Sequence, residues 1–315
     1  MNKLKVVVIG LGAISQRVYL PILSKNTNWE LLGAFTPNAK KREEICQQYN
    51  MINFGSIAES IEQADAVFVN SSTATHYAIV KECLEAGKDV YVDKPLAETV
   101  EQAEELAHLA ESLDRKLMVG FNRRFAPLYN ELKTQSASAT SFRIEKHRIN
   151  NVGPQDWVFT MFDDYLHLID IARWLGGDEL KMVYNKIIVA DEGHLLSAHH
   201  VFETPQMITI TTEMHRNAGT RLEEIAAITD GQIVRVKNLD TIEYEKENKV
   251  NVLSPDETKW DHYYRGFEAC IAHFIDCVVN DKLPIVDGFE ALRSQQLVNE
   301  IIQSFPKRDF DKQSS

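Results

Sequence analysis

Short apolar runs alternate with amphipathic stretches along residues 1–121 of the chain. The runs are rich in β-branched residues, as in buried strands, whereas the stretches between them repeat apolar residues at helical spacing. Strands that alternate with helices predict a parallel, doubly wound sheet. The predicted strands are 6–9, 31–35, 66–70, 90–92 and 117–121, and the predicted helices are 16–23, 40–48, 75–86 and 99–112.

After residue 121 the pattern changes to consecutive strands, which follow a short helix over 128–134. Asp230-Gly231 predicts a hairpin turn between the last two strands. Runs of strands without intervening helices indicate an antiparallel sheet. We therefore expect one domain over 1–121 and a second, α+β domain over 122–315. The strands expected in the second domain are 141–149, 182–190, 195–202, 207–215, 224–229 and 233–236.

The first strand runs directly into Gly10-Leu11-Gly12-Ala13-Ile14-Ser15 and then into a helix. Gly10 permits the tight turn, Gly12 permits a pyrophosphate to approach the backbone, and the amides of Ala13 and Ile14 at the helix start favour an anion. Ser15 stands where a third glycine is usual. The motif predicts a dinucleotide-binding, Rossmann-type domain, and the alternative is a chance glycine turn.

An acidic residue usually follows the glycine turn by about twenty residues when the cofactor is NAD. Thr36 occupies that place, so no carboxylate repels a 2'-phosphate, and Lys40, Lys41 and Arg42 follow in the next helix. The pattern favours NADP, with Thr36 and Lys41 beside the phosphate, and leaves NAD open. The alternative is that these basic side chains only lie in solvent at the start of the helix.

The predicted strand over 90–92 ends abruptly on Asp93-Lys94-Pro95. Ligands of open α/β sheets collect at the carboxyl ends of the strands. Pro95 has no amide proton, and its ring pushes Lys94 toward an extended conformation, so we expect Lys94 to be held in place. The alternative is a surface lysine in a loop.

Helical periodicity interrupts the later strands over 163–175 and ends at a glycine pair. Asp163, His167 and Asp170 lie on one face of this helix. A carboxylate one turn from a histidine can orient and charge the imidazole for proton transfer. The alternatives are a structural polar face and a metal site, but no further ligand cluster has matching spacing, and we expect no metal.

The charge balance argues against several classes of partner. The chain has 34 basic and 46 acidic residues and a formal charge of -12, which repels nucleic acid and acidic membrane surfaces. No apolar run approaches the length of a membrane span or a signal-peptide core. We expect a cytoplasmic protein that binds neither nucleic acid nor membrane.

The four cysteines of the chain lack CxxC spacing and are expected to be buried thiols: Cys46, Cys83, Cys270 and Cys277.

Three longer motifs carry a resemblance to a known family. They are Asp-Lys-Pro-Leu-Ala at 93–97, Val-Gly-Phe-Asn-Arg-Arg-Phe-Ala-Pro-Leu-Tyr at 119–129 and Asp-Asp-Tyr-Leu-His at 163–167. With the glycine turn, they resemble the glucose-fructose oxidoreductase, inositol dehydrogenase and MocA (Gfo/Idh/MocA) family over essentially the whole chain, and its MviM-type branch in particular. The resemblance implies an α/β fold in which a Rossmann-type doubly wound parallel sheet precedes an α+β domain with a large, mainly antiparallel open sheet.

The same resemblance implies an NAD(P)-dependent oxidoreductase that transfers hydride between a nicotinamide cofactor and a hydroxyl or carbonyl of a sugar, polyol or related compound. In the implied mechanism His167 moves the hydroxyl proton, Asp163 raises the basicity of His167, and Lys94 polarises the reacting oxygen. A homo-oligomer built on the open sheet of the second domain is also implied. The implied cofactor-binding residues are Ser71, His76, Asp93, Lys94 and Asn122.

Departures from the family pattern favour a second hypothesis. Asp93 replaces the usual glutamate, Tyr165 replaces a glycine two residues before His167, and the glycine-rich run before Asp163 is missing. In this interpretation the bulky Tyr165 narrows or refills the pocket. The alternative function is therefore a cofactor-binding regulatory or structural protein without turnover.

The predicted strand around 142–148 carries four potential cations in a chain of net negative charge. Strand alternation places Lys146 and Arg148 on one face and Arg143 and His147 on the other. In one interpretation, one set pairs with acidic neighbours and the other is solvated. In the other interpretation, Lys146 or Arg148 reaches the substrate beside the strand-end lysine and selects an acidic sugar.

Overall fold

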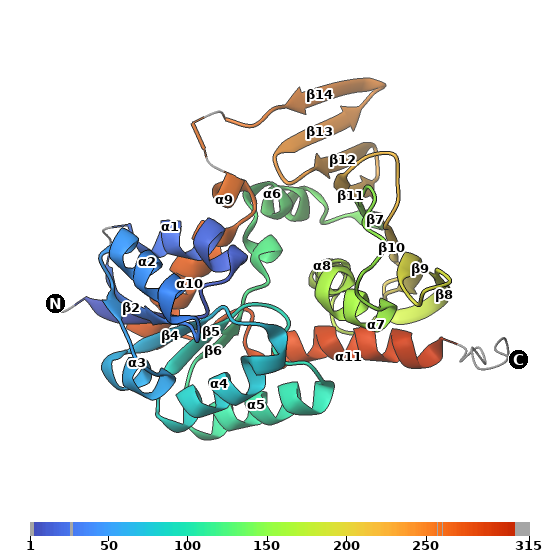
Figure 1. Cartoon of the computed structure of the whole chain (residues 1–315). Helices are drawn as coiled ribbons and strands as arrows, with labels where there is room; N and C mark the ends of the chain where they lie inside the picture. The colour runs from blue at the N-terminus through green and yellow to red at the C-terminus, as the bar shows by residue number, and fades with distance from the viewer. Residues whose placement is uncertain (1–2, 26–27, 257, 260, 306–315) are drawn as a thin grey trace, which may run out of the picture. The chain divides into compact units, whose positions relative to one another are not determined.

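The computed structural model of the chain describes residues 3–25, 28–256, 258–259 and 261–305 (Figure 1). The chain divides into two compact units. Unit 1 comprises Met1–Asn130 and Asp256–Arg293, and unit 2 comprises Glu131–Pro255 and Ser294–Ser315. The boundary expected after residue 121 differs from this division, because the chain returns to unit 1 after residue 255 and adds a helix to its core.

Unit 1 is built on a parallel sheet of six strands in the order β3-β2-β1-β4-β5-β6. The direction of winding reverses between β1 and β4, which is where open α/β sheets form their ligand crevice. The predicted doubly wound sheet is confirmed, and only the two-residue β3 was not foreseen. The strands are β1 (Leu4–Ile9), β2 (Trp29–Phe35), β3 (Ile52–Asn53), β4 (Ala66–Val69), β5 (Asp89–Val92) and β6 (Leu117–Val119).

Helices cover both faces of this sheet (Figure 1). Phe274 packs edge-on against Phe68 and Tyr91 of the sheet, with ring centroids 5.4 and 5.7 Å apart. Thr99 caps its helix by accepting a hydrogen bond from the backbone nitrogen of Gln102 (3.3 Å), as the capping-box spacing predicts. The helical segments of unit 1 are η1 (Ser15–Tyr19), α1 (Leu20–Leu23), α2 (Ala39–Tyr49), α3 (Ile57–Gln63), α4 (Thr73–Glu85), α5 (Val100–Ser112), η2 (Asn122–Phe125), α9 (Asp261–Tyr264) and α10 (Phe267–Val279).

Unit 2 is built on a sheet of eight strands in the order β14-β13-β12-β11-β7-β10-β9-β8. Neighbouring strands are antiparallel except for β7 and β10, which are parallel. The predicted turn at Asp230-Gly231 joins β11 to β12, with Gly231 at φ +75°. The strands are β7 (Ala139–His147), β8 (Lys181–Val189), β9 (Leu195–Glu203), β10 (Thr209–His215), β11 (Leu222–Thr229), β12 (Gln232–Lys237), β13 (Thr241–Lys246) and β14 (Lys249–Leu253).

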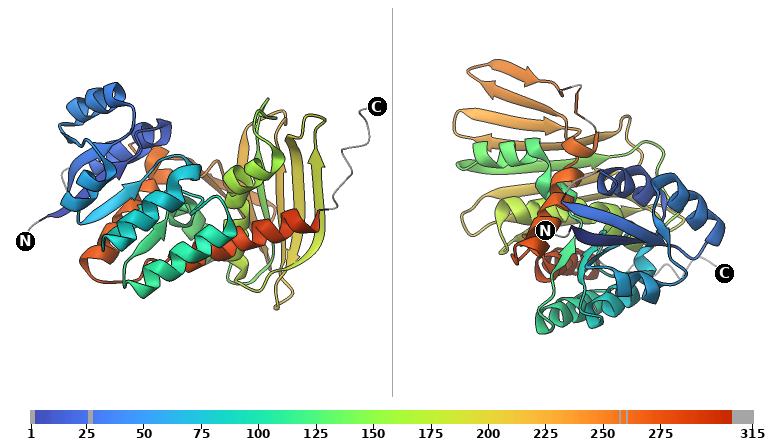
Figure 2. Two further views of the ribbon diagram at one scale, coloured as in Figure 1. Left: turned by 60° about the horizontal axis from the view of Figure 1, so that its bottom comes forward. Right: turned by 90° about the vertical axis from the view of Figure 1, so that its left-hand side faces the viewer.

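The two faces of the unit 2 sheet differ. On β7, Phe142, Ile144 and Lys146 are buried whereas Arg143 is exposed, which is the alternation of a sheet covered on one side. Helix α8 lies against the buried face, and the opposite face carries no helix in the described part of unit 2 (Figure 2). The large, mainly antiparallel open sheet is confirmed. The remaining helical segments are α6 (Pro127–Gln135), α7 (Trp157–Thr160), η3 (Met161–Tyr165), α8 (Leu166–Gly176) and α11 (Gly288–Ser304).

Candidate functional site

The glycine turn follows β1 and closes against the end of β4. Gly10 has φ +99°, a conformation that other residues rarely adopt, and a Cβ atom there would lie 2.5 Å from the backbone nitrogen of Ser71. A Cβ atom at Gly12 would meet no atom within 4 Å. Ala13 and Ile14 follow as the first helical residues. The backbone around Gly12 is therefore open to a pyrophosphate at the carboxyl ends of β1 and β4.

Two buried polar side chains beside this turn point to a ligand. Ser15 Oγ and both side-chain amide atoms of Asn70 have no hydrogen-bond partner among the described residues. Buried polar groups normally have a partner, which can be an ordered water or a ligand. A nicotinamide dinucleotide with its water molecules would supply these partners, so the residues of the turn fit that cofactor. Asn70 was not predicted as a site residue, because asparagine at a strand end is a common turn residue.

Arg42 is held in place beside Thr36, which directly follows β2. Arg42 donates through Nη1 to the carbonyl oxygen of Thr36 (2.7 Å) and through Nε to Asn53 Oδ1 (2.6 Å). Its guanidinium carbon lies 5.2 Å from the ring centroid of Phe35. The side chain of Lys41, which the sequence analysis selected, is exposed. The structure thus brings Thr36 together with Arg42, a residue that the sequence left as one of three equivalent bases.

The Asp93-Lys94-Pro95 motif after β5 is held in place by the buried hydroxyl group of Tyr19. Tyr19 Oη donates to Asp93 Oδ1 (3.1 Å), and the backbone nitrogen of Lys94 donates to the same oxygen (3.0 Å). Burial raises the pKa of Asp93, although the Lys94 charge acts in the opposite direction. A Cβ atom at Gly120 would lie 2.7 Å from Tyr91 Oη, so only glycine at position 120 leaves room for the Tyr91 hydroxyl group. Asp93 therefore fixes the backbone from which Lys94 projects.

His76 joins the segment after β4 to the segment after β5. Its Nδ1 lies 2.8 Å from the carbonyl oxygen of Pro95, and its Nε2 lies 3.2 Å from that of Ser71. The ring is buried, and this burial lowers the pKa of His76. The structure therefore brings together Ser71, His76, Asp93 and Lys94, which the resemblance placed at the cofactor.

Asn122 follows β6 and opens η2. Its side-chain amide donates to the carbonyl oxygen of Arg265 (2.7 Å), which holds the segment before α10. A Cβ atom at Gly266 would lie 2.3 Å from the carbonyl oxygen of Asn122. The amide nitrogen of Asn122 thus has a structural partner, and its contact with a cofactor stays a prediction.

Unit 2 carries the expected aspartate and histidine on one continuous helical segment. Asp163 lies in η3, a single π-helical turn, and His167 lies in the first turn of α8 and is 7% exposed. Asp170, one turn further, accepts a hydrogen bond from Ser294 Oγ (2.9 Å), which in turn accepts from Arg173 Nη1 (2.8 Å). Asp170 is therefore part of a structural network, and Asp163 with His167 remains the candidate catalytic pair.

Tyr165 is held between η3 and the sheet of unit 2. Its side chain is fully buried, and its hydroxyl donates to His200 Nδ1 (2.5 Å) and lies 2.8 Å from Thr212 Oγ1. His200 Nε2 donates to Asn185 Oδ1 (3.0 Å), which leaves Nδ1 as an acceptor. Burial lowers the pKa of His200 to about 3, so the ring is neutral. Tyr165 therefore anchors η3 to β9 and β10.

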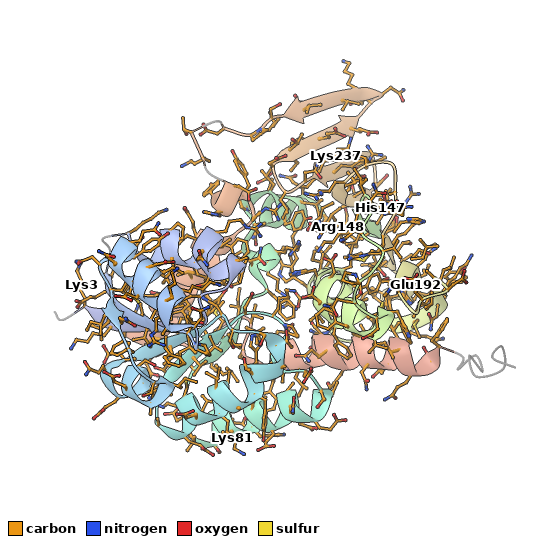
Figure 3. The ribbon with its side chains drawn as sticks, viewed as in Figure 1. Lys3, Lys81, His147, Arg148, Glu192 and Lys237 are labelled. Carbon is orange, nitrogen blue, oxygen red and sulfur yellow. The ribbon has the colours of Figure 1, made fainter. Side chains whose placement is uncertain are left out.

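Asp164 lies at the centre of three cations. Its Oδ1 accepts from Lys146 Nζ (2.5 Å) and Arg148 Nη2 (3.1 Å), and its Oδ2 accepts from Arg148 Nε (3.2 Å) and Arg216 Nη1. Burial alone would raise the pKa of Asp164, but Lys146 and Arg148 hold it well below its usual range. We call these four residues the Asp164 cluster; Figure 3 labels Arg148 and its neighbour His147. Lys146 and Arg148 thus pair with an acidic residue, as one of the two interpretations of their strand predicted.

Two other kinds of site are absent from the described residues. No group of three or more histidine, cysteine, aspartate or glutamate side chains there could hold a metal ion. No helix in that part of the chain is long and apolar enough to cross a membrane.

Comparison with known proteins agrees with this architecture. A model described as an oxidoreductase family with an NAD-binding Rossmann fold matches residues 4–121, and a model of the YceM-like C-terminal domain matches residues 127–247. YceM of Salmonella typhimurium is 43% identical over 300 residues, covering 95% of this chain and 97% of YceM. The chain belongs to the Gfo/Idh/MocA oxidoreductase family. The resemblance carried by the sequence motifs is thereby confirmed.

Two other relatives support the Gfo/Idh/MocA assignment over most of the chain. The crystal structure of a dehydrogenase (MviM) from Clostridium difficile has a TM-score of 0.94 and 40% identity, covering 96% of this chain and 99% of that one. The inositol 2-dehydrogenase/D-chiro-inositol 3-dehydrogenase of Halalkalibacterium halodurans is 26% identical over 291 residues, covering 86% of this chain and 82% of its own. As a member of this family, the chain is an NAD(P)-dependent dehydrogenase or reductase that acts on CH–OH groups.

Proposed function

We propose that this Gfo/Idh/MocA enzyme transfers hydride between a nicotinamide cofactor and a hydroxyl or carbonyl group of a sugar, polyol or related compound. The inositol dehydrogenases among its relatives support a polyhydroxylated substrate. The observation that carries the proposal is the rigid support of Lys94. Its backbone nitrogen binds Asp93, Asp93 accepts from Tyr19, and Pro95 is tied to His76.

This support matters because a catalytic cation works by being fixed where charge develops. Lys94 follows a strand at the carboxyl edge of the parallel sheet, where ligands of such sheets bind. A cation held there stabilises the oxygen of the substrate as carbonyl or alkoxide character changes, without reorganising during the reaction. We assign that role to Lys94.

The proton is assigned to the pair on unit 2. His167 takes the hydroxyl proton in oxidation and returns it in reduction, and Asp163 favours the charged imidazole that forms. The nicotinamide, when bound, supplies or accepts the hydride. Asp93, His76 and Ser71 keep the two strand-end segments of the cofactor site together.

NADP is the cofactor that we propose, with NAD as the competing possibility. Arg42 stands beside Thr36 in a position fixed by three partners, and a fixed guanidinium suits the 2'-phosphate that distinguishes NADP. Asn38, which caps α2, carries no charge that would repel that phosphate.

We further propose a cytoplasmic homo-oligomer that assembles through the open face of the unit 2 sheet. Exposed apolar side chains on the edge strand β8 support this interface, with Tyr184 at 44% and Ile188 at 40% exposure. The compartment is supported by the four cysteines, which are all free and buried, as in proteins of a reducing compartment.

The proposed function is tested in two steps. NADPH and NADH are first titrated against the protein by fluorescence, and a panel of sugars and polyols is then screened for oxidation with the tighter-binding cofactor. We expect binding of NADPH and turnover of at least one compound. Cofactor binding with no turnover of any compound in either direction would contradict the proposal and favour the regulatory alternative.

A further inference from the structure

The Asp164 cluster has features that a purely structural ion pair does not need. It lies at the carboxyl ends of β7 and β10, which form the parallel pair of the unit 2 sheet, so both strands deliver cations to one place. Asp164 itself directly follows Asp163 and stands three residues before His167. The cluster is therefore joined by one short helical segment to the proposed proton-transfer pair.

Asp164 is saturated as an acceptor. Its two oxygens receive four donors, which fill the approximately four lone-pair positions of a carboxylate. The guanidinium groups are not saturated in the same way. Among the described residues, no partner is present for Arg148 Nη1 or for Arg216 Nη2, since Arg216 uses Nε on the carbonyl oxygen of Asn151 and Nη1 on Asp164.

The cluster also has an excess of positive charge. Two guanidinium groups share one carboxylate, which leaves one positive charge even before Lys146 is counted. The side chain of Arg216 is 10% exposed and that of Arg148 is 28% exposed, so the cluster is largely screened from solvent but reachable through Arg148. Charges that are removed from water are normally paired. Glu145 does not provide the second anion, because it lies on the other face of β7 and pairs with His147.

We propose that Arg148 and Arg216 bind the carboxylate of the substrate, so that the compound which this enzyme oxidises or reduces is a sugar acid. The inference rests on the proposed oxidoreductase function and names its substrate class. The planar guanidinium fork matches a carboxylate in two parallel hydrogen bonds, and because the fork can bind a phosphate in the same way, the test below includes a phosphorylated sugar. Asp164 holds the two arginines in place.

The experiment compares acids with neutral sugars in the wild type and in matched variants. Glucuronate, galacturonate and gluconate are assayed beside glucose, galactose and myo-inositol, with glucose 6-phosphate as a dianion. We expect kcat/KM for the acids to exceed that for the neutral compounds at least about tenfold, and Arg148→Gln to remove this preference mainly through KM. Arg143→Gln is the control, because Arg143 lies on the same strand but on the opposite face.

Equal kcat/KM for acids and neutral compounds in the wild type, or the same loss in Arg148→Gln for both classes, would overturn the proposal. A preference for glucose 6-phosphate over all three acids would overturn the assignment to a carboxylate. Arg148→Lys is a second variant, which keeps the charge and the fold but loses the fork, and it should restore only part of the preference.

A further variant is expected to strengthen the binding of a sugar acid, whereas Arg148→Gln weakens it. Asp164→Asn removes the internal carboxylate that competes for the arginines, so glucuronate should bind several-fold more tightly to it. If no compound is turned over, the oxidoreductase proposal fails, and calorimetric titration of glucuronate into the NADPH complex decides the binding site separately. Binding that is lost in Arg148→Gln supports the site, and absence of binding to the wild type overturns it.

Discussion

Lys94 and His167 are the two side chains on which the chemistry is proposed to depend. Lys94→Ala removes the cation beside the reacting oxygen, and His167→Ala removes the proton acceptor. We expect each variant to lower kcat by about 10²-fold or more, because positioned acid–base and electrostatic groups contribute at least this much. Steady-state assays with the best compound of the panel, together with thermal unfolding to show an intact fold, measure the effect.

The control for this prediction is Lys81→Ala. Lys81 pairs with Glu105 on the surface of unit 1, and an exposed pair of this kind contributes little. Its loss should leave kcat unchanged. Near-wild-type turnover in Lys94→Ala or His167→Ala would remove that residue from the mechanism.

Arg42 is expected to decide between the two nicotinamide cofactors. In the wild type NADPH should bind more tightly than NADH. Arg42→Ala should weaken NADPH about tenfold or more and leave NADH nearly unchanged, because a charge-assisted hydrogen bond contributes about 1.5 to 3 kcal/mol. Thr36→Asp should reverse the preference by repelling the 2'-phosphate. Dissociation constants for both cofactors test this, with Lys40→Ala as the exposed control. Tighter binding of NADH to the wild type would refute it.

At the scale of single residues, the sequence predicted those that belong to local motifs. The glycine turn and the segment after β5 are each contiguous, so Gly10, Gly12 and Lys94 could be found from spacing alone. Tyr19 could not be found, and Arg42 could not be told apart from Lys40 and Lys41, because the contacts of Tyr19 with Asp93 and of Arg42 with Asn53 depend on which strands are neighbours. The partners of Tyr165 could not be predicted for the same reason: the sequence shows the size of its side chain but not its direction.

The attachment of η3 to the sheet is expected to respond to pH through His200. The folded protein holds this ring neutral with a pKa of about 3, whereas an unfolded histidine has a pKa of about 6.5. A histidine with a lowered pKa stabilises the fold fully above its unfolded value, and this stabilisation is lost as the pH falls toward the folded value. The change between pH 6.5 and pH 5 should be about 1.5 kcal/mol.

The contribution of this ring is isolated by comparing variants. His200→Gln removes the titrating group, so its free energy of unfolding should fall less steeply between pH 6.5 and pH 5 than that of the wild type. Urea unfolding at several pH values measures both slopes. His108→Gln, at a side chain that is 62% exposed, should keep the wild-type slope. Identical slopes in His200→Gln and the wild type would show that the ring is protonated without cost.

At the scale of elements, strong local signals succeeded and weak ones did not. The cap at Thr99 and the turn at Gly231 are set by residues within a few positions, and the helix over 99–112 and the turn were both predicted. The hairpin of β13 and β14 was missed, although Ile242 and Tyr244 alternate with polar residues and Asn248 has the positive φ of a tight turn. Every residue of β14 is exposed, so no buried face marks it as a strand.

At the scale of the whole molecule, the sequence predicted two sheets and their classes but not the path of the chain between the units. The apolar residues Phe267, Cys270, Ile271 and Phe274 recur at helical spacing in α10, which shows that this helix is buried but not on which sheet. Its packing in unit 1 depends on Phe274 meeting Phe68 and Tyr91, residues almost two hundred positions earlier. The parallel pairing of β7 with β10 is equally non-local, and without it the Asp164 cluster cannot be anticipated.

The open face of the unit 2 sheet is the surface on which assembly is expected to depend. Val201 lies in β9, on the face opposite the buried His200 and Phe202, and its cross-strand neighbour is the uncharged Thr211. The wild type should sediment as a dimer or larger species. Val201→Glu places an unpaired charge where two sheets would meet, and burying such a charge costs several kcal/mol, so the variant should shift toward monomer. Leu113→Glu is the matched control, since Leu113 is a 41% exposed apolar residue of unit 1. Sedimentation velocity of all three proteins provides the test: a monomeric wild type, or an unchanged mass in Val201→Glu, would show that this face is not the interface.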